Sequence, residues 1–314
     1  MNIKQINRQI KRSIGLYCTK CVFTLLRVLP RWCVYIFAES TARIGYYIAV
    51  RHRRIAQESL RIAFEGKKTE KEIKAIIIGC FSAMVKGMLE VFASMGNPKI
   101  LDKMVAVEGR ENLDKALAKG KGVILVSAHF GNFPLLLTKL AILGYKVNVV
   151  VRKMRDEKAD EYFRIKRDAL GVKSIYSHPR NTCVQNSIDA LRKNELVFML
   201  MDQNFGTGGV FVDFFGRKAA TATGPVVFAL RTEAIILPVF IIGGGNNTHR
   251  LIIEKELELR HDSDRQLVIQ NGVADITKII EKYIRQYPAE WGWIHRRWKT
   301  QPKKTKEDSD DKKN

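Results

Sequence analysis

A short apolar run that ends at a histidine and is followed by a proline constrains the fold of this 314-residue chain most. Residues 122–127 are largely β-branched and apolar, which is typical of a buried strand. The following turn carries His129, and Pro134 opens the apolar stretch 135–143, since proline is favoured in the first turn of a helix. In α/β sheets ligands bind beyond the carboxyl ends of the strands. The sequence therefore places His129 where a ligand site is expected.

The rest of the chain alternates predicted helices with predicted strands. Thr69 and Glu72 form a capping-box pattern at the start of a helix. The apolar side chains that follow at helical spacing, Met84 and Met88 among them, predict a core face. Helices are predicted at 69–95, 110–118, 156–170, 182–193 and 266–286, and further strands at 104–107, 147–151, 196–201, 234–242 and 250–257. This alternation predicts an α/β fold, a mixed sheet flanked by helices, within one domain at 61–302.

Residues 1–60 predict a separate, membrane-associated helical segment. Residues 14–29 and 31–50, separated by Pro30, are apolar but interrupted by charges, which spoils an ordinary membrane span. Twelve Lys or Arg lie between residues 1 and 61, against Glu39 and Glu58, and aromatic residues are interleaved with them. This pattern suits two amphipathic or partly inserted helices in the headgroup layer of an anionic membrane, on its cytoplasmic side. The alternative is a helical hairpin packed on the core.

The net charge of +22 implies an acidic partner. The sequence holds no zinc-finger, RNP or helix-turn-helix pattern, so an anionic membrane and an acidic carrier protein explain the charge better than nucleic acid does. Residues 303–314 are charged and lack apolar side chains, which predicts a disordered tail.

The five cysteines predict neither a metal site nor a disulfide framework. Cys18 and Cys21 lie three residues apart in an apolar stretch, without a second pair of ligands. The odd number fits a reducing compartment. We expect no metal and no cofactor.

Seven sequence blocks carry a resemblance to a known family. The block Ala128-His129-Phe130-Gly131-Asn132 comes first, and blocks at 201–204, 209–217, 223–225, 229–232, 238–240 and 293–300 follow in the family's order. Together they resemble the bacterial lipid A biosynthesis acyltransferases, within the wider glycerolipid and lysophospholipid acyltransferases, and the similarity extends from about residue 30 to 300. The resemblance implies a glycerolipid-acyltransferase-like fold on the cytoplasmic face of a bacterial inner membrane. It also implies transfer of a fatty acyl chain from an acyl-carrier-protein or CoA thioester to a lipid hydroxyl. A lipid A precursor is the first choice of acceptor, and a lysophospholipid or another amphiphile the second.

One position departs from the family. The family has a carboxylate five residues after its histidine, where this chain has Pro134. Proline cannot hold an imidazole through its side chain, whereas the third member of a catalytic triad does so. Three alternatives follow: a carboxylate from elsewhere, such as Asp202 or Asp156; a backbone carbonyl; or a lipid-binding homologue with impaired catalysis.

The candidate site follows from these observations. His129 is the predicted catalytic base, because its ordinary pKa lies near neutrality. Gly131 and Asn132 either face the oxyanion or only form the turn. Arg152 follows a predicted strand and is a candidate for binding phosphate, with a solvated arginine as the alternative.

The remaining candidates stand at other strand ends or in family blocks. Asp202 ends a predicted strand, where it either orients His129 or pairs with Arg231. The resemblance implies phosphate-binding or structural positions for Asp213, Arg217 and Arg231. Three tryptophans at 291, 293 and 298, with basic residues between them, form either an interfacial belt or a packed terminal segment.

Overall fold

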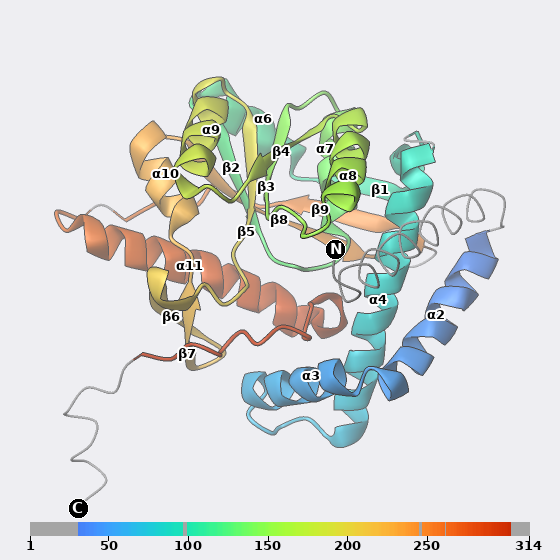
Figure 1. Ribbon diagram of the computed structural model, residues 1–314. Coiled ribbons are helices and arrows are strands. Elements are labelled where there is room, and N and C mark those ends of the chain that lie inside the picture. Colours follow the sequence, from blue (N-terminus) through green and yellow to red (C-terminus); the bar gives the residue numbers. More distant parts are fainter. Residues whose placement is uncertain (1–30, 97–98, 245–246, 261, 303–314) are drawn as a thin grey trace, which may run out of the picture.

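The computed structural model describes residues 31–96, 99–244, 247–260 and 262–302 (Figure 1). The predicted helix at 14–29 and the predicted disordered tail lie outside these residues. The helices are α2 (Arg31–Ile48), α3 (Val50–Ala63), α4 (Glu70–Gly96), α5 (Ile100–Met104), α6 (Arg110–Ala118), α7 (Phe133–Ile142), α8 (Glu157–Ala169), α9 (Arg180–Arg192), α10 (Gly224–Thr232) and α11 (Arg265–Gln286), with short 3-10 turns η1 (Gly206–Gly208) and η3 (Pro288–Glu290). The strands are β1 (Val105–Glu108), β2 (Val123–Ser127), β3 (Val147–Val151), β4 (Val172–Tyr176), β5 (Leu196–Leu200), β6 (Val210–Phe214), β7 (Arg217–Thr221), β8 (Ile235–Gly243) and β9 (His249–Ile253).

Seven of these strands form one mixed sheet, which confirms the predicted architecture. Their order is β1-β9-β8-β2-β5-β3-β4. Strands β8, β2, β5, β3 and β4 run parallel to one another. Strand β9 is antiparallel to β8, and β1 pairs in parallel with β9. Strand β2 lies in the centre of the sheet, and all five of its residues are buried. The carboxyl end of β2 therefore lies between the carboxyl ends of its two parallel neighbours, β8 and β5.

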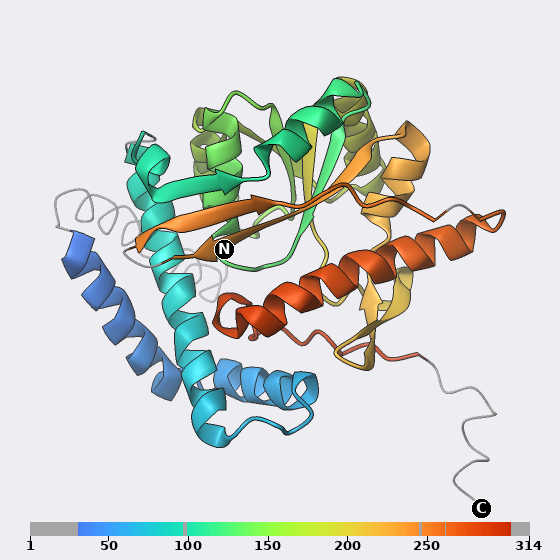
Figure 2. The ribbon, with the colours of Figure 1, turned by 180° about the vertical axis from the view of Figure 1, so that it is seen from behind.

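Helices cover both faces of the sheet (Figure 1 and Figure 2). Because side chains alternate along a strand, β2 contributes Ile124 and Val126 to one core, and Val123 and Leu125 to the other. The first core includes side chains of α9, α10 and α11 and the amino-terminal half of α4. The second includes side chains of α5, α6 and α7. Burial of these two apolar sets fixes the sheet between the helical layers.

The long helix α4 links the sheet to the amino-terminal helices. The capping box is confirmed: the Thr69 N–H donates to a carboxylate oxygen of Glu72 at 2.8 Å, and the Glu72 N–H donates to the Thr69 hydroxyl at 3.3 Å. Helix α2 lies along α4 in both ribbon views, with Ala38, Ala42 and Tyr46 buried. The described part of the amino-terminal segment is thus packed on the domain through one side of α2.

Among the described residues, one helix is long and apolar enough to cross a membrane. It spans residues 70–94, with a mean hydropathy of 1.8, and 44% of its most apolar window is buried within the protein. A buried helix of a globular domain has the same composition. Because α4 contacts α2, α3, α7 and η3, we interpret it as a core helix.

Several elements escaped prediction from sequence. Strand β4 lies at the edge of the sheet and carries Lys173 and Ser174, which weakens its apolar pattern. The hairpin β6–β7 turns at Phe215 and Gly216, which both have positive φ, and its strands pair only with each other. Helices α3, α5 and α10 were also missed. The other predicted elements within the described residues are present, with bounds shifted by a few residues.

Candidate active site

His129 and Asp202 meet beyond the ends of β2 and β5. These strands are parallel neighbours, and their ladder closes with Ser127 opposite Leu200. His129 and Asp202 each stand two residues further along. The Nδ1 atom of His129 lies 2.9 Å from Oδ1 of Asp202, and the His129 backbone N–H donates to Oδ2 at 3.0 Å. Register alone thus brings together two residues that are far apart in sequence.

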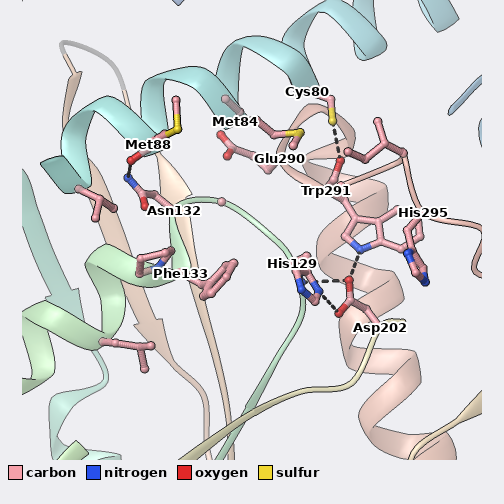
Figure 3. A pocket seen from close by; sticks show the side chains of 18 of the residues that line it. Cys80, Met84, Met88, His129, Asn132, Phe133, Asp202, Glu290, Trp291 and His295 are labelled. Atoms are coloured by element: carbon pink, nitrogen blue, oxygen red, sulfur yellow. Dashed lines mark hydrogen bonds and ion pairs between the residues drawn. The ribbon is translucent and has the colours of Figure 1, made fainter. Parts of the chain in front are cut away.

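Asp202 is buried, and three donors surround its carboxylate (Figure 3). Besides the two groups of His129, the Trp291 indole N–H donates to Oδ2 at 2.7 Å. The segment 290–292 runs beside the histidine turn, where Gly292 N–H donates to His129 O at 3.0 Å. This backbone pairing of segment 290–292 with the histidine turn holds Trp291 against the carboxylate of Asp202. Asp202 is therefore fixed in one orientation, with an oxygen aimed at Nδ1.

The electrostatics of the pair favour a charged carboxylate. Burial opposes ionisation of Asp202, but the charge of His129 and the hydrogen bonds from His129 and Trp291 hold the pKa of this carboxyl below its ordinary value. Burial likewise opposes charge on His129, but the charge and hydrogen bond of Asp202 outweigh it, so the pKa of His129 is raised. The acceptor at Nδ1 assigns the ring proton to that atom. Nε2 of the neutral ring then carries the lone pair that can take a proton.

The other proposed carboxylate, Asp156, has a different place. Its side chain accepts a hydrogen bond from the Ala159 N–H at 2.9 Å, so it caps α8. Among the alternatives left open by Pro134, a carboxylate from another strand end is the one that the geometry provides.

The turn after His129 is tightly constrained. Gly131 has a φ of +55°, and a Cβ there would overlap the backbone oxygen of Ile241. The Gly131 N–H donates to Glu290 O at 2.8 Å. The Asn132 amide donates to Gly87 O at 3.0 Å and to Oε2 of Glu90 at 2.9 Å. Because these donors are already engaged within the protein, the turn-forming interpretation of Gly131 and Asn132 is favoured over the oxyanion one.

A cavity of about 670 Å³ opens beside His129, between α4, α7, β3 and α8. The His129 side chain is 36% exposed. Most of the remaining lining is apolar: Ala83, Met84, Met88, Val91, Phe92, Phe133, Leu137, Val149, Val151 and Phe163. The volume lies in the range of small-molecule sites, and the lining suits a hydrocarbon chain.

Two methionines were assigned wrongly from sequence. Met84 and Met88 are 48% and 51% exposed and face the cavity from α4, although helical spacing predicted a core face (Figure 3). The same periodicity places side chains toward a core or toward a ligand cavity, because both are apolar. The unbranched thioether side chains adapt to irregular apolar partners.

Cys80 also lines the cavity, but its chemistry is not that of a nucleophile. Its thiol donates to Trp291 O at 3.1 Å, and burial raises the pKa of Cys80 to about 12. Since the thiolate is the reactive form, Cys80 is inert near neutral pH. Among the described residues there is no cluster of His, Cys, Asp or Glu that could hold a metal ion.

The basic candidates from sequence lie outside the cavity lining. Arg152 is exposed after β3, and Arg217 and Arg231 are exposed on β7 and at the end of α10. Asp213 is exposed on the hairpin and pairs with Lys218 at 3.1 Å. Asp202 contacts His129 and Trp291, so its alternative pairing with Arg231 is wrong.

Five polar residues that line the cavity received no role in the site from the sequence: His52, Arg167, Gln203, Glu290 and His295. Arg167 of α8 lines it, with its Nε donating to the Ser174 hydroxyl at 2.9 Å. Gln203, next to Asp202, has its amide nitrogen 3.1 Å from Nε2 of His129. His295 lines the same cavity, and burial lowers its pKa. Gln203 and His295 lie in the family-like blocks, which was the available signal.

The terminal tryptophans form a packed segment. Trp291, Trp293 and Trp298 are 1%, 0% and 6% exposed, so the interfacial-belt interpretation is wrong. Arg297 is buried among them and donates to Ala220 O at 2.6 Å and to Gln203 O at 3.3 Å. Burial of large aromatic side chains contributes much to stability. Here it fixes the terminal segment against Asp202 and Gln203, which Trp291 and Arg297 contact.

Comparison with known proteins adds a family likeness. The family model described as bacterial lipid A biosynthesis acyltransferase matches residues 1–300. The chain is 28% identical over 262 residues to a lipid A biosynthesis palmitoleoyltransferase of Escherichia coli, covering 80% of each protein. It is 23% identical over 287 residues to a lipid A biosynthesis lauroyltransferase of the same organism, covering 90% of each.

Two further likenesses are more limited. A phosphatidylinositol mannoside acyltransferase of Mycobacterium tuberculosis is 29% identical over 139 residues, which cover 44% of this chain and 43% of that protein. The crystal structure of a 1-acyl-sn-glycerophosphate acyltransferase from Thermotoga maritima matches with a TM-score of 0.36 and 14% identity, covering 81% of this chain and 98% of that one.

Proposed function

Because the chain belongs to the bacterial lipid A biosynthesis acyltransferase family, and is thus an enzyme that transfers acyl groups, we propose that it moves a fatty acyl chain from a thioester to a hydroxyl of a lipid A precursor. The observation that carries the proposal is the His129–Asp202 pair, with Nδ1 and Oδ1 2.9 Å apart, in the lining of a largely apolar cavity. A positioned base beside a hydrocarbon-sized cavity is what direct acyl transfer to a hydroxyl requires.

The reaction then uses this chain's groups as follows. His129 Nε2 takes the proton of the acceptor hydroxyl as its oxygen attacks the thioester carbonyl carbon. Asp202 stabilises the imidazolium and keeps Nδ1 protonated. The tetrahedral intermediate collapses, the carbon–sulfur bond breaks, and the leaving thiolate receives the proton from Nε2. The products are the acylated lipid and a free thiol, so no covalent enzyme intermediate is needed.

The donor in this proposal is an acyl-carrier protein or acyl-CoA. Both present a thioester at the end of a phosphate-bearing arm. Arg167 offers a guanidinium at the lining of the cavity, and the net charge of +22 favours approach of an acidic carrier. We assign Arg152, Arg217 and Arg231 roles further from the chemistry, on the surface that the donor or acceptor phosphates would cross.

We further propose that the amino-terminal segment, residues 1–60, rests on the cytoplasmic face of a bacterial inner membrane, with residues 61–302 as the catalytic domain. The outward side of α2 supports this. It exposes a set of large apolar residues: Ile36, Phe37, Ile44, Tyr47 and Ile48. Arg51 and Arg54 are exposed at the start of α3. An apolar stripe bordered by cations suits anionic headgroups above acyl chains.

Two alternatives to this proposal remain: one has a different acceptor lipid, and the other is a lipid-binding protein that is not an enzyme. A lysophospholipid or another amphiphile would need the same base and the same cavity. A lipid-binding homologue without catalysis was suggested by Pro134, but Asp202 supplies the hydrogen bond that Pro134 cannot. The geometry therefore favours an active enzyme.

The test compares the full-length protein with His129→Ala in lipid vesicles, with acyl-carrier-protein and CoA thioesters as donors. Lipid A precursors and lysophospholipids are supplied as acceptors. We expect acylation of the lipid A precursor by the parent and a loss of about 10²–10⁴-fold in the variant. His178→Ala, an exposed histidine outside the cavity, is the matched control. Activity of His129→Ala within a few-fold of the parent would remove His129 from the mechanism.

A further inference from the structure

Gln203 contacts the atom on which the proposed reaction depends. Its amide nitrogen lies 3.1 Å from Nε2 of His129. Since Nδ1 carries the ring proton, Nε2 is an acceptor and the Gln203 amide is the donor. The carboxamide therefore occupies the position that the acceptor hydroxyl must take.

The backbone of Gln203 is held while its side chain is exposed. Its carbonyl accepts a hydrogen bond from the buried Arg297 guanidinium at 3.3 Å, and it follows directly after the buried Asp202. Within the described residues, the contact with His129 is the one hydrogen bond formed by the Gln203 side chain. The backbone of Gln203 is thus fixed, whereas its exposed carboxamide group is free to rotate once the contact with His129 is broken.

The tetrahedral intermediate needs a donor at this place. Its oxyanion lies two bonds from the hydroxyl oxygen, and oxyanion donors work at about 2.7–3.1 Å. The Gly131 N–H and the Asn132 amide are engaged with Glu290 O and with Glu90 and Gly87 O. An amide displaced from Nε2 by the incoming hydroxyl stays next to that hydroxyl and retains its two N–H groups.

We propose that Gln203 has two successive roles: its amide caps the Nε2 lone pair of His129 before substrate binds, and it then donates to the oxyanion of the tetrahedral intermediate. This rests on the proposed acyl transfer and adds a residue to it. In the first role Gln203 is a positioning residue. In the second it contacts the reacting atoms.

The first role is tested without turnover. Histidine-selective NMR of the substrate-free protein gives the pKa of His129, whose signal is assigned by its loss in His129→Ala, and the chain has six histidines. Besides the inert thiol of Cys80, the titratable groups that act on the ring or line the same cavity are Asp202 after β5, His295 of the terminal segment, and His52, Arg167 and Glu290. None is altered in the variants.

Gln203→Ala removes the donor that stabilises neutral imidazole, so the pKa of His129 should rise by roughly 0.5–1 unit. Gln203→Glu places a carboxylate there and should raise it further. Gln185→Ala, an exposed glutamine of α9 bonded to Asp189, is the control and should leave it unchanged. An unchanged pKa in Gln203→Ala and Gln203→Glu would overturn the capping role.

The second role is tested by kinetics. Gln203→Ala should lower kcat by about 10²–10³-fold with little change in the KM of the acceptor, because the oxyanion exists only during the reaction. Gln203→Glu should lose at least as much, since it repels the oxyanion. Equal kcat in parent and Gln203→Ala would overturn the oxyanion role. A parent without acyl transfer would instead overturn the proposed function, and the NMR result would still decide the capping role.

Discussion

His129 and Asp202 occupy equivalent positions at the ends of two adjacent parallel strands, each two residues beyond the pair that closes the ladder, with Nδ1 and Oδ1 2.9 Å apart. This relationship makes the carboxylate independent of the helix that follows the histidine. It explains how Pro134 can stand in α7, where the family has an acid, without leaving the imidazole unsupported. The consequences for catalysis and for stability can be separated by changing Asp202.

Asp202→Asn should lower kcat by about 10²–10⁴-fold. The amide keeps the size of the side chain, but it can present an N–H to Nδ1 and so favour the tautomer with the proton on Nε2. Steady-state kinetics with a saturating thioester would measure the loss. Asp189→Asn, on α9 and bonded to Gln185, is a control for the charge change. A rate near that of the parent would show that the tautomer is fixed by another group.

The pH dependence of activity should carry the signature of the pair. Activity needs neutral His129, whose pKa is raised above its ordinary value of about 6.5 by Asp202. The acid limb of kcat/KM should therefore lie above pH 6.5 in the parent. In Asp202→Asn burial remains but the carboxylate charge is gone, so the limb should move to lower pH. A pH profile of kcat/KM for both proteins measures this, and a shift in the opposite direction would contradict it.

The same pKa shifts determine the pH range in which the His129–Asp202 pair stabilises the fold. The lowered pKa of Asp202 gives stability that is present above its unfolded pKa, about 3.9, and lost as the pH falls. The raised pKa of His129 gives stability that is present below about pH 6.5 and lost as the pH rises through its folded value. The difference in free energy of unfolding between parent and Asp202→Asn should thus be largest between about pH 4 and 6.5. Urea unfolding of both proteins from about pH 3 to about pH 8, which extends past both ends of this range, measures the difference, and a difference that does not vary with pH would contradict the coupling.

Much of the fold could be predicted because local patterns determined it. Buried strands such as Leu196–Leu200 are continuous apolar runs, and the Thr69–Glu72 capping box marks a helix start without tertiary information. Edge strand β4 and the hairpin β6–β7 depend on neighbours that the local sequence does not reveal, so they were missed. The position of His129 at a strand end was predictable for the same reason that β2 was.

The residues that contact His129 were harder to predict from the sequence. Asp202 was one of two carboxylates at predicted strand or helix ends, and only the β2–β5 register distinguishes it from Asp156. Trp291 reaches the carboxylate because the terminal segment returns beside the turn, a long-range contact with no local signal. Met84 and Met88 show the converse problem, because an apolar helical face does not say whether protein or ligand will cover it.

Charges on the outward side of α2 should weaken vesicle binding. Ile44 and Ile48 are 57% and 75% exposed, and burial of each in the bilayer interface would contribute about 1.5–3 kcal/mol. Ile44→Glu and Ile48→Glu should therefore shift the full-length protein from pellet to supernatant when it is sedimented with anionic vesicles. Leu267→Glu, 41% exposed on α11, is the matched control and should sediment like the parent. Unchanged sedimentation of the α2 variants would argue against this face as the membrane contact.

Pro134→Glu tests whether the family's acid position is still needed. Pro134 lies in the first turn of α7 and lines the cavity, and a glutamate there is compatible with the helix dipole, so the fold should persist. If Asp202 fills the role of the missing acid, the new carboxylate finds Nδ1 already engaged and adds a charge beside an apolar cavity. We expect kcat/KM to be unchanged or lower than in the parent, and Pro134→Ala to be close to the parent. In the Asp202→Asn background the same substitution should recover part of the lost kcat, because the introduced glutamate would then be the remaining carboxylate near the ring. A gain in kcat/KM from Pro134→Glu alone would mean that Asp202 orients His129 incompletely, and that the departure at this position limits the enzyme.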